Sequence, residues 1–195
     1  MFKVICIGDS LTTGYGICKE LTWFNLLKNK FCNVDFINKG VNGNLSTDML
    51  FRFYDDVLLE HPTHCFILCG TNDFFFNHSS KKVLENIIFM CSDCINNNVT
   101  PLLLIPILTC EYMAIKSWDS SIDYNSVNTK IEKLKILLKN YCMENNISII
   151  DLNTNYASYK NNKKENLYID GVHPSSLGHE LIYKNIFYNI YQLIN

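Results

Sequence analysis

The stretch "VICIGDSLTTGYG", residues 4–16, places an acid, a hydroxyl and three glycines directly after an apolar run. The run at residues 2–7 is short and apolar, which predicts a buried strand that ends at Gly8. A tight strand-to-helix turn would explain the glycines. A nucleophile held at the edge of a sheet would also explain Ser10. The ends of the other strands distinguish these two interpretations.

Four more apolar runs of strand length follow, at residues 34–37, 64–69, 99–108 and 147–152. Amphipathic stretches separate them, and helices are expected at about residues 21–31, 46–61, 80–95, 127–141 and 174–193. Ser46 is expected to cap the second helix, and Pro174 to begin the last. The alternation predicts an α/β fold, a three-layer doubly wound sandwich with a five-stranded parallel sheet. A length of 195 residues suits one domain, residues 1–195.

The bulk composition excludes several classes of partner. A formal net charge of −2 gives no general attraction to nucleic acid. No segment approaches the roughly 20 apolar residues of a membrane span, so stable membrane insertion is not expected. Nine cysteines without a recognisable signal peptide predict a reducing, cytoplasmic location. The composition leaves the oligomeric state open.

Polar residues at the strand ends supply the parts of an acyl-transfer site. In a parallel sheet, ligands bind at the carboxyl ends of the strands, so the residues that follow the strands belong to one edge. Ser10 is a weak nucleophile without a base, and His173 is the candidate base. Asp170, three residues earlier, can accept from one imidazole nitrogen and leave the other to take the serine proton.

The same edge offers donors for the oxyanion of a tetrahedral intermediate. The backbone amide of Ser10 is one, and Asn72 can add its side-chain amide. Gly43 can bring a bare backbone amide close because it has no side chain. Gly40 lies in the same segment, Asn38-Lys39-Gly40-Val41-Asn42-Gly43, and is the alternative to Gly43.

Four blocks of sequence carry a family resemblance: Gly8-Asp9-Ser10-Leu11, Gly43, Gly70-Thr71-Asn72-Asp73 and Asp170-Gly171-Val172-His173. In order and spacing they resemble the blocks of the SGNH (GDSL-type) serine esterase and lipase family. The resemblance implies a flavodoxin-like sheet of order 2-1-3-4-5, with no metal and no cofactor. It also implies Ser10 as nucleophile, His173 as base and Asp170 as its orienting partner, with Gly43 and Asn72 in the oxyanion hole.

Aromatic residues near these blocks are candidates for the substrate pocket. Phe74 and Phe75 directly follow the block that contains Asn72, and consecutive aromatics cannot all point into one core. Tyr112 and Trp118 lie in the loop expected after the fourth strand, at the same edge, and are expected to help cover the pocket. Asp9 is interpreted as a cap or turn residue, because Asp170 already fills the role of orienting carboxylate.

The combined interpretation is a serine hydrolase that cleaves carboxylic esters of small substrates through a Ser-His-Asp triad and an acyl-enzyme. Lysophospholipids, thioesters and aryl esters are conceivable substrates. A carbohydrate O-acetylesterase is the alternative, because the Asn- and Tyr-rich loops suit sugar hydroxyls equally well. A non-catalytic binding module on the same sheet is a third hypothesis. Against nucleotide or flavin binding, the first loop has neither a GxGxxG nor a P-loop lysine pattern.

Overall fold

The computed structural model describes residues 2–157, 159 and 164–194. Its centre is a five-stranded sheet of order β2-β1-β3-β4-β5 in which every neighbouring pair is parallel. The strands are β1 (Phe2–Gly8), β2 (Val34–Gly40), β3 (His64–Leu68), β4 (Thr100–Ile105) and β5 (Ser148–Asp151). The predicted fold class and strand order are therefore confirmed.

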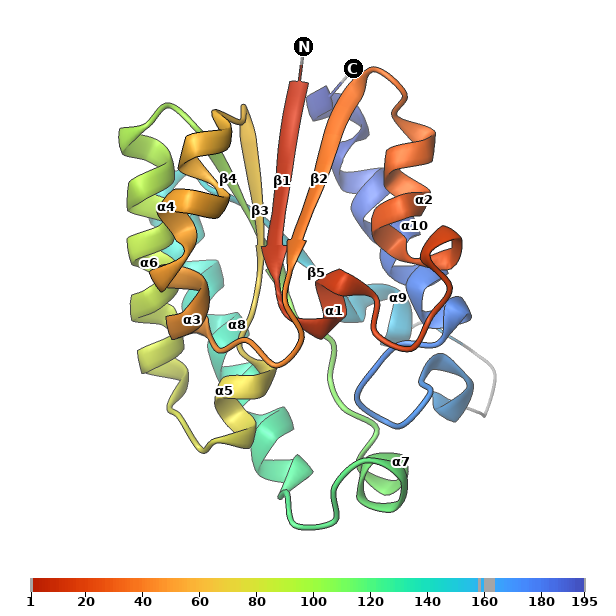
Figure 1. The fold of residues 1–195 in the computed structure, drawn as a ribbon. Coiled ribbons are helices and arrows are strands. Elements are labelled where there is room, and N and C mark those ends of the chain that lie inside the picture. The colour runs from red at the N-terminus through yellow and green to blue at the C-terminus, as the bar shows by residue number, and fades with distance from the viewer. Residues whose placement is uncertain (1, 158, 160–163, 195) are drawn as a thin grey trace.

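Helices cover both faces of the sheet (Figure 1). One layer contains α2 (Trp23–Lys30) and α10 (Ser176–Ile194), and the opposite layer contains α3 (Ser46–Phe51), α4 (Phe53–Asp56), α6 (Ser80–Asn96) and α8 (Tyr124–Asn145). Alternate residues of β1 enter the two cores, with Val4 and Cys6 on one side and Ile5 and Ile7 on the other. Burial on both faces explains why this strand is continuously apolar.

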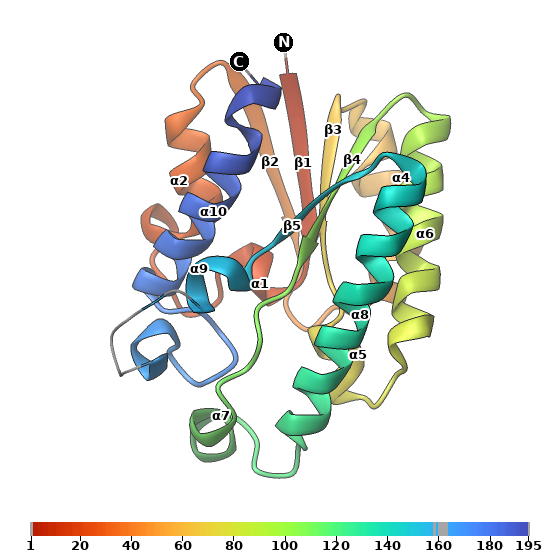
Figure 2. The same cartoon turned by 180° about the vertical axis from the view of Figure 1, so that it is seen from behind.

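Short helices gather where the strands end. α1 (Ser10–Thr13) follows β1, α5 (Thr71–Phe75) follows β3, and α7 (Glu111–Ser117) follows β4. Seen from behind in Figure 2, α9 (Asn153–Ala157) follows β5 at the same edge. The carboxyl ends of the strands thus meet in one region, as the doubly wound topology requires.

The second expected helix is interrupted and begins differently from the prediction. It is divided into α3, α4 and a 3₁₀ turn at Leu58–Glu60. Ser46 does not cap it, because Leu45 occupies the cap position and the Ser46 hydroxyl donates to Asp73 Oδ1 at 2.6 Å. A cap hydroxyl accepts from a backbone amide, but the Ser46 oxygen accepts from Asn86 Nδ2 at 2.8 Å while its hydrogen goes to Asp73, so tertiary partners use the side chain that sequence rules assign to a cap.

The last helix also begins later than predicted. Pro174 forms an antiparallel bridge with Tyr168, and α10 starts at Ser176. The segment that follows the fourth strand, expected to be a loop, contains α7, and the segment between the fifth strand and the last helix contains α9 and a 3₁₀ turn at Lys164–Leu167. The fourth strand ends at Ile105, before Pro106, which has no amide hydrogen for the ladder.

Candidate active site

Ser10 is the first residue of α1, directly beyond the carboxyl end of β1. Asp9 caps this helix, since its Oδ1 accepts from the Leu11 amide at 2.9 Å. The turn needs a glycine at position 8, because a Cβ there would lie 2.8 Å from the Leu68 carbonyl oxygen. The sharp turn presents the Ser10 hydroxyl to a pocket at the sheet edge.

The structure brings Ser10, His173 and Asp170 into one hydrogen-bonded chain. Ser10 Oγ lies 3.0 Å from His173 Nε2, and His173 Nδ1 lies 2.7 Å from Asp170 Oδ2. The other carboxylate oxygen, Oδ1, accepts from the backbone amides of Val172 and His173, each at 2.8 Å. The carboxylate is thus fixed by the turn that carries the histidine.

The environment of Asp170 favours its ionised form. Burial alone would raise the pKa of Asp170. Hydrogen bonds from the His173 ring and from the amides of His173 and Val172 outweigh that effect and hold the pKa below its usual value. An ionised Asp170 accepts from Nδ1–H, which leaves Nε2 free to accept the Ser10 proton. The arrangement can therefore activate a hydroxyl.

Gly43 and Asn72 line the same pocket as Ser10. Gly43 has φ +78°, a conformation that glycine adopts without strain. Asn72 Nδ2 donates to the Asn44 carbonyl at 3.1 Å and to Asp9 Oδ2 at 3.3 Å. Gly40, the alternative to Gly43, is the last residue of β2 and pairs with Gly8 of β1. Strand pairing therefore explains the position of this glycine.

The pocket has a volume of about 240 Å³. Of the four predicted aromatic residues, Phe75 and Trp118 line it. Phe74 does not, because it is 2% exposed and belongs to the core beneath α5. Tyr112 is 72% exposed on α7 and is not among the lining residues. The two consecutive phenylalanines thus divide between pocket and core, since neighbouring positions on a helix face different directions.

Sequence reasoning missed two lining residues, Tyr15 and Asn42. The Tyr15 ring lies 4.6 Å from the His173 ring between centroids, and Trp118 lies 4.8 Å from it at 69°. The imidazole is therefore flanked by two aromatic rings. The available signal was proximity in sequence, because Tyr15 lies within the same short stretch as Ser10 and Asn42 is next to Gly43.

A second histidine lies near the site but is not positioned as a base. His179 is fully buried, and its Nδ1 accepts from the Trp23 amide at 3.3 Å. Burial lowers the pKa of His179 to about 4, with a smaller contribution from the charge of His173. The ring is therefore neutral at ordinary pH and belongs to the packing of α10 against α2.

Asp9 is fully buried, and this gives a testable dependence of stability on pH. Burial raises the pKa of Asp9 to about 7, against opposing effects of the Leu11 amide and the charge of His173. The nearby Asp73 carboxylate adds to the rise. The folded state then keeps the proton up to about pH 7, whereas the unfolded chain releases it near pH ~4. Between these values the folded state binds more protons, so raising the pH costs stability.

We expect Asp9→Asn to remove this cost. Relative to wild type, its free energy of unfolding should rise by up to about 1.4 kcal/mol per pH unit between pH ~4 and ~7. Urea unfolding of both proteins across this range measures the difference. Asp55→Asn, at an exposed acid of α4, is the control. Parallel curves for wild type and Asp9→Asn would contradict the expectation.

Within residues 2–157, 159 and 164–194, no group of three or more His, Cys, Asp or Glu side chains is arranged to hold a metal ion. Over the same residues, no helix combines the length and the apolar character needed to cross a bilayer.

Comparison with known proteins adds a family match and structural neighbours. The profile of the GDSL-like lipase/acylhydrolase family matches residues 6–181. A Desulfitobacterium hafniense protein assigned to the lipolytic G-D-S-L family superposes with a TM-score of 0.79, at 25% identity, covering 95% of this chain and 98% of that one. A lipase/acylhydrolase from Enterococcus faecalis superposes with a TM-score of 0.81, at 23% identity, covering 99% and 97%. Both share the fold of this chain.

One curated relative also matches in sequence. The uncharacterized lipoprotein YqeF of Bacillus subtilis is 31% identical over an alignment 119 positions long, and the alignment covers 54% of this chain. The match spans about half of that relative, 49% of its length. Because its name describes a lipoprotein, the cytoplasmic location stays a prediction.

Proposed function

Because this chain belongs to the GDSL-like lipase/acylhydrolase family, and is thus a carboxylic ester hydrolase, we propose that Ser10, His173 and Asp170 are its catalytic triad. The observation that carries the proposal is the continuous hydrogen-bonded chain from Ser10 Oγ through both imidazole nitrogens to Asp170. It ends at a pocket, where an ester carbonyl can reach the hydroxyl.

In the proposed reaction, Ser10 Oγ attacks the ester carbonyl carbon while its proton passes to His173 Nε2. The negative charge that develops on the carbonyl oxygen is stabilised by the amides of Ser10 and Gly43 and by Asn72 Nδ2, which turns toward it the hydrogen that it otherwise gives to Asp9 Oδ2 at 3.3 Å. The C–O bond to the alcohol then breaks, and His173 returns the proton to the leaving oxygen. Water, deprotonated by His173, attacks the acyl-enzyme and releases the carboxylic acid and free Ser10.

The size and chemistry of the pocket support a small, uncharged substrate group. Its volume of about 240 Å³ is below the roughly 300–1,000 Å³ typical of pockets for drug-sized ligands. Phe75 and Trp118 provide apolar walls, and none of the described residues that line it is Lys, Arg, Asp or Glu. We therefore assign the natural substrate to esters with a short, uncharged acyl group.

Turnover of nitrophenyl esters of increasing chain length tests this assignment. We expect kcat/KM to be highest for the acetyl or butyryl ester and to fall by about tenfold or more for the octanoyl ester, because a long chain does not fit. Phe75→Ala, which enlarges the pocket, should reduce this discrimination. Equal kcat/KM across the series would contradict the short-acyl assignment and leave the triad proposal standing.

A carbohydrate O-acetylesterase is the second candidate. The observation that favours it is the pair of exposed aromatic rings at the mouth of the pocket, Tyr15 and Trp118, with centroids 6.1 Å apart. Aromatic faces beside a small acyl pocket suit a sugar that carries an acetyl group. Acetate release from an acetylated xylooligosaccharide, compared with phenyl acetate, distinguishes the candidates: the sugar ester should have the higher kcat/KM if the alcohol is a carbohydrate.

A further inference from the structure

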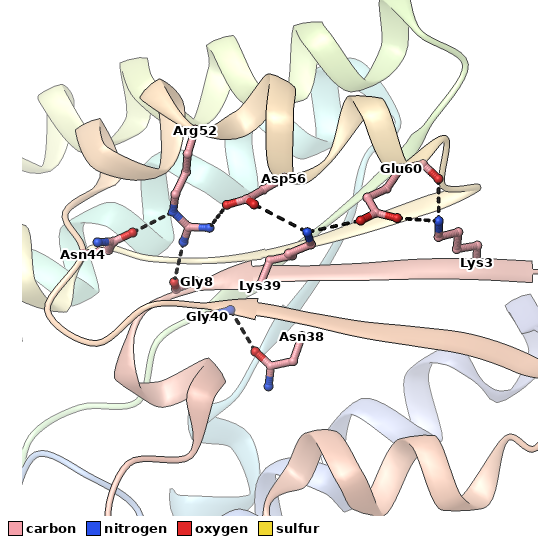
Figure 3. Close-up of polar contacts among 9 residues, drawn as sticks. All are labelled: Lys3, Gly8, Asn38, Lys39, Gly40, Asn44, Arg52, Asp56 and Glu60. Carbon is pink, nitrogen blue, oxygen red and sulfur yellow. Dashed lines mark hydrogen bonds and ion pairs between the residues drawn. The ribbon is translucent and has the colours of Figure 1, made fainter.

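A chain of alternating charges leads along β1 and β2 toward the candidate active site (Figure 3). Lys3 Nζ lies 2.7 Å from Glu60 Oε2, and Lys39 Nζ lies 3.2 Å from Glu60 Oε1 and 3.5 Å from Asp56 Oδ1. Asp56 Oδ2 is in turn 2.6 Å from Arg52 Nη1. The chain therefore ends at Arg52, near the carboxyl end of β1, where Ser10 lies.

The other two guanidinium nitrogens of Arg52 donate to a side-chain oxygen of Asn44 and to the backbone carbonyl of Gly8. Nε donates to Asn44 Oδ1 at 2.8 Å, and Nη2 donates to the Gly8 carbonyl at 3.1 Å. Its side chain is 17% exposed. A guanidinium is a rigid planar fork, so three acceptors on three segments are held in one fixed geometry. Figure 3 shows the guanidinium between these three partners.

These two partners of Arg52, Gly8 and Asn44, lie close to the proposed oxyanion donors. Gly8 is two residues before Ser10, and its carbonyl also accepts from the Val41 amide at 3.0 Å. Asn44 follows Gly43 directly, and its own carbonyl accepts from Asn72 Nδ2 at 3.1 Å. Arg52 thus contacts Gly8, in the segment that carries Ser10, and Asn44, which is next to Gly43 and bonds to Asn72. These segments carry all three donors.

We propose that Arg52 is a positioning residue that fixes the geometry of the oxyanion hole, an inference that rests on the proposed function. It does not line the pocket, so it acts through Gly8 and Asn44. Asp56 anchors it directly, whereas Glu60 pairs with Lys3 and Lys39 and is not a partner of Arg52. Stabilisation of an oxyanion depends on donors placed before the charge develops, and small displacements of such groups are costly.

The test compares two substitutions with different hydrogen-bonding capacity. Arg52→Met fills similar space without donors, and Arg52→Lys keeps the charge but cannot reproduce the three-way fork. We expect kcat for nitrophenyl acetate to fall by about 10- to 100-fold in Arg52→Met, with KM within about threefold of wild type. Arg52→Lys should recover part of that loss. A fall in kcat with a nearly unchanged KM indicates an interaction made chiefly in the transition state.

A matched control separates positioning from stability. Glu60→Gln breaks the ion pairs with Lys3 and Lys39, in the same series of charges but away from Arg52. It should therefore lower the melting temperature and leave kcat unchanged. Rates are expressed per reactive serine, counted by complete fluorophosphonate labelling, so unfolded protein does not enter the comparison. Asn44→Ala removes one acceptor of Arg52. Its effect should be less than additive with Arg52→Met, because both break the same contact.

The outcomes distinguish this proposal from the proposed function. If wild type turns over and Arg52→Met has the same kcat per reactive serine as Glu60→Gln, the role of Arg52 is overturned and the triad stands. If KM rises while kcat is unchanged, Arg52 serves substrate binding and the proposal also fails. If the wild-type serine is unreactive, the proposed function and the role of Arg52 fall together. A fall in kcat confined to Arg52→Met and Asn44→Ala, with partial recovery in Arg52→Lys, supports the proposal.

Discussion

Ser10→Ala is expected to lower kcat for nitrophenyl acetate hydrolysis by about 10⁶-fold, close to complete loss. Without Oγ no acyl-enzyme forms, and the remaining rate comes from water attacking an ester held beside the oxyanion donors. The substitution deletes one oxygen that contacts His173 Nε2 at 3.0 Å, so the fold should persist. Steady-state hydrolysis, with folding checked by circular dichroism, measures the effect.

Ser92→Ala is the matched control. Ser92 lies on α6, and its hydroxyl donates to the Ile88 carbonyl of the same helix at 2.9 Å. The same atom is removed from a helix on the outer layer of the fold, so kcat should equal that of wild type. Comparable turnover in Ser10→Ala and Ser92→Ala would contradict the assignment of Ser10 as the nucleophile.

Asp170→Asn is expected to have the second largest effect, a fall in kcat of about 10⁴-fold. The side-chain oxygen that this variant retains could still accept from the Val172 and His173 amides, so the turn should survive. The new amide nitrogen would then face His173 Nδ1 as a donor. The imidazole would have to place its proton on Nε2, which would leave it unable to accept the proton of Ser10.

Asp119→Asn tests whether loss of any turn carboxylate has this effect. Asp119 Oδ1 accepts from the Ser121 amide and hydroxyl at 2.8 and 2.6 Å, so it supports a turn as Asp170 does. It has no contact with His173 among its described bonds, and kcat should stay at the wild-type level. The two variants are compared by kcat for nitrophenyl acetate at pH 7 to 8. Equal activity of Asp170→Asn and wild type would remove Asp170 from the mechanism.

The sheet could be predicted because its strands are buried on both faces. A run such as Val4–Ile7 has no polar side to obscure it, and the alternation with amphipathic stretches restricts the topology. Helix starts were less predictable, because tertiary partners compete with local rules. Ser46 is the clearest case: its hydroxyl serves Asp73, a residue 27 positions away, instead of a helix cap.

The polar residues of the candidate site were predicted together because each follows a strand of one parallel sheet. Ser10, Asn72 and His173 come from segments far apart in sequence, and the sheet edge brings them together. The surrounding residues were not predictable in this way. Tyr15 packs on His173 across the pocket, and Arg52 acts through contacts with Gly8 and Asn44. Such contacts depend on side-chain directions that no sequence period records.

Covalent labelling of the folded wild-type protein with a fluorophosphonate, followed by peptide mass spectrometry, tests directly whether Ser10 is the activated nucleophile. Phosphorus takes the place of the ester carbonyl carbon, so only a hydroxyl activated by a base should displace the fluoride. We expect a single adduct on Ser10, which is lost in Ser10→Ala and formed far more slowly in Asp170→Asn. Absence of an adduct on folded wild type, or an adduct on another residue, would contradict this expectation.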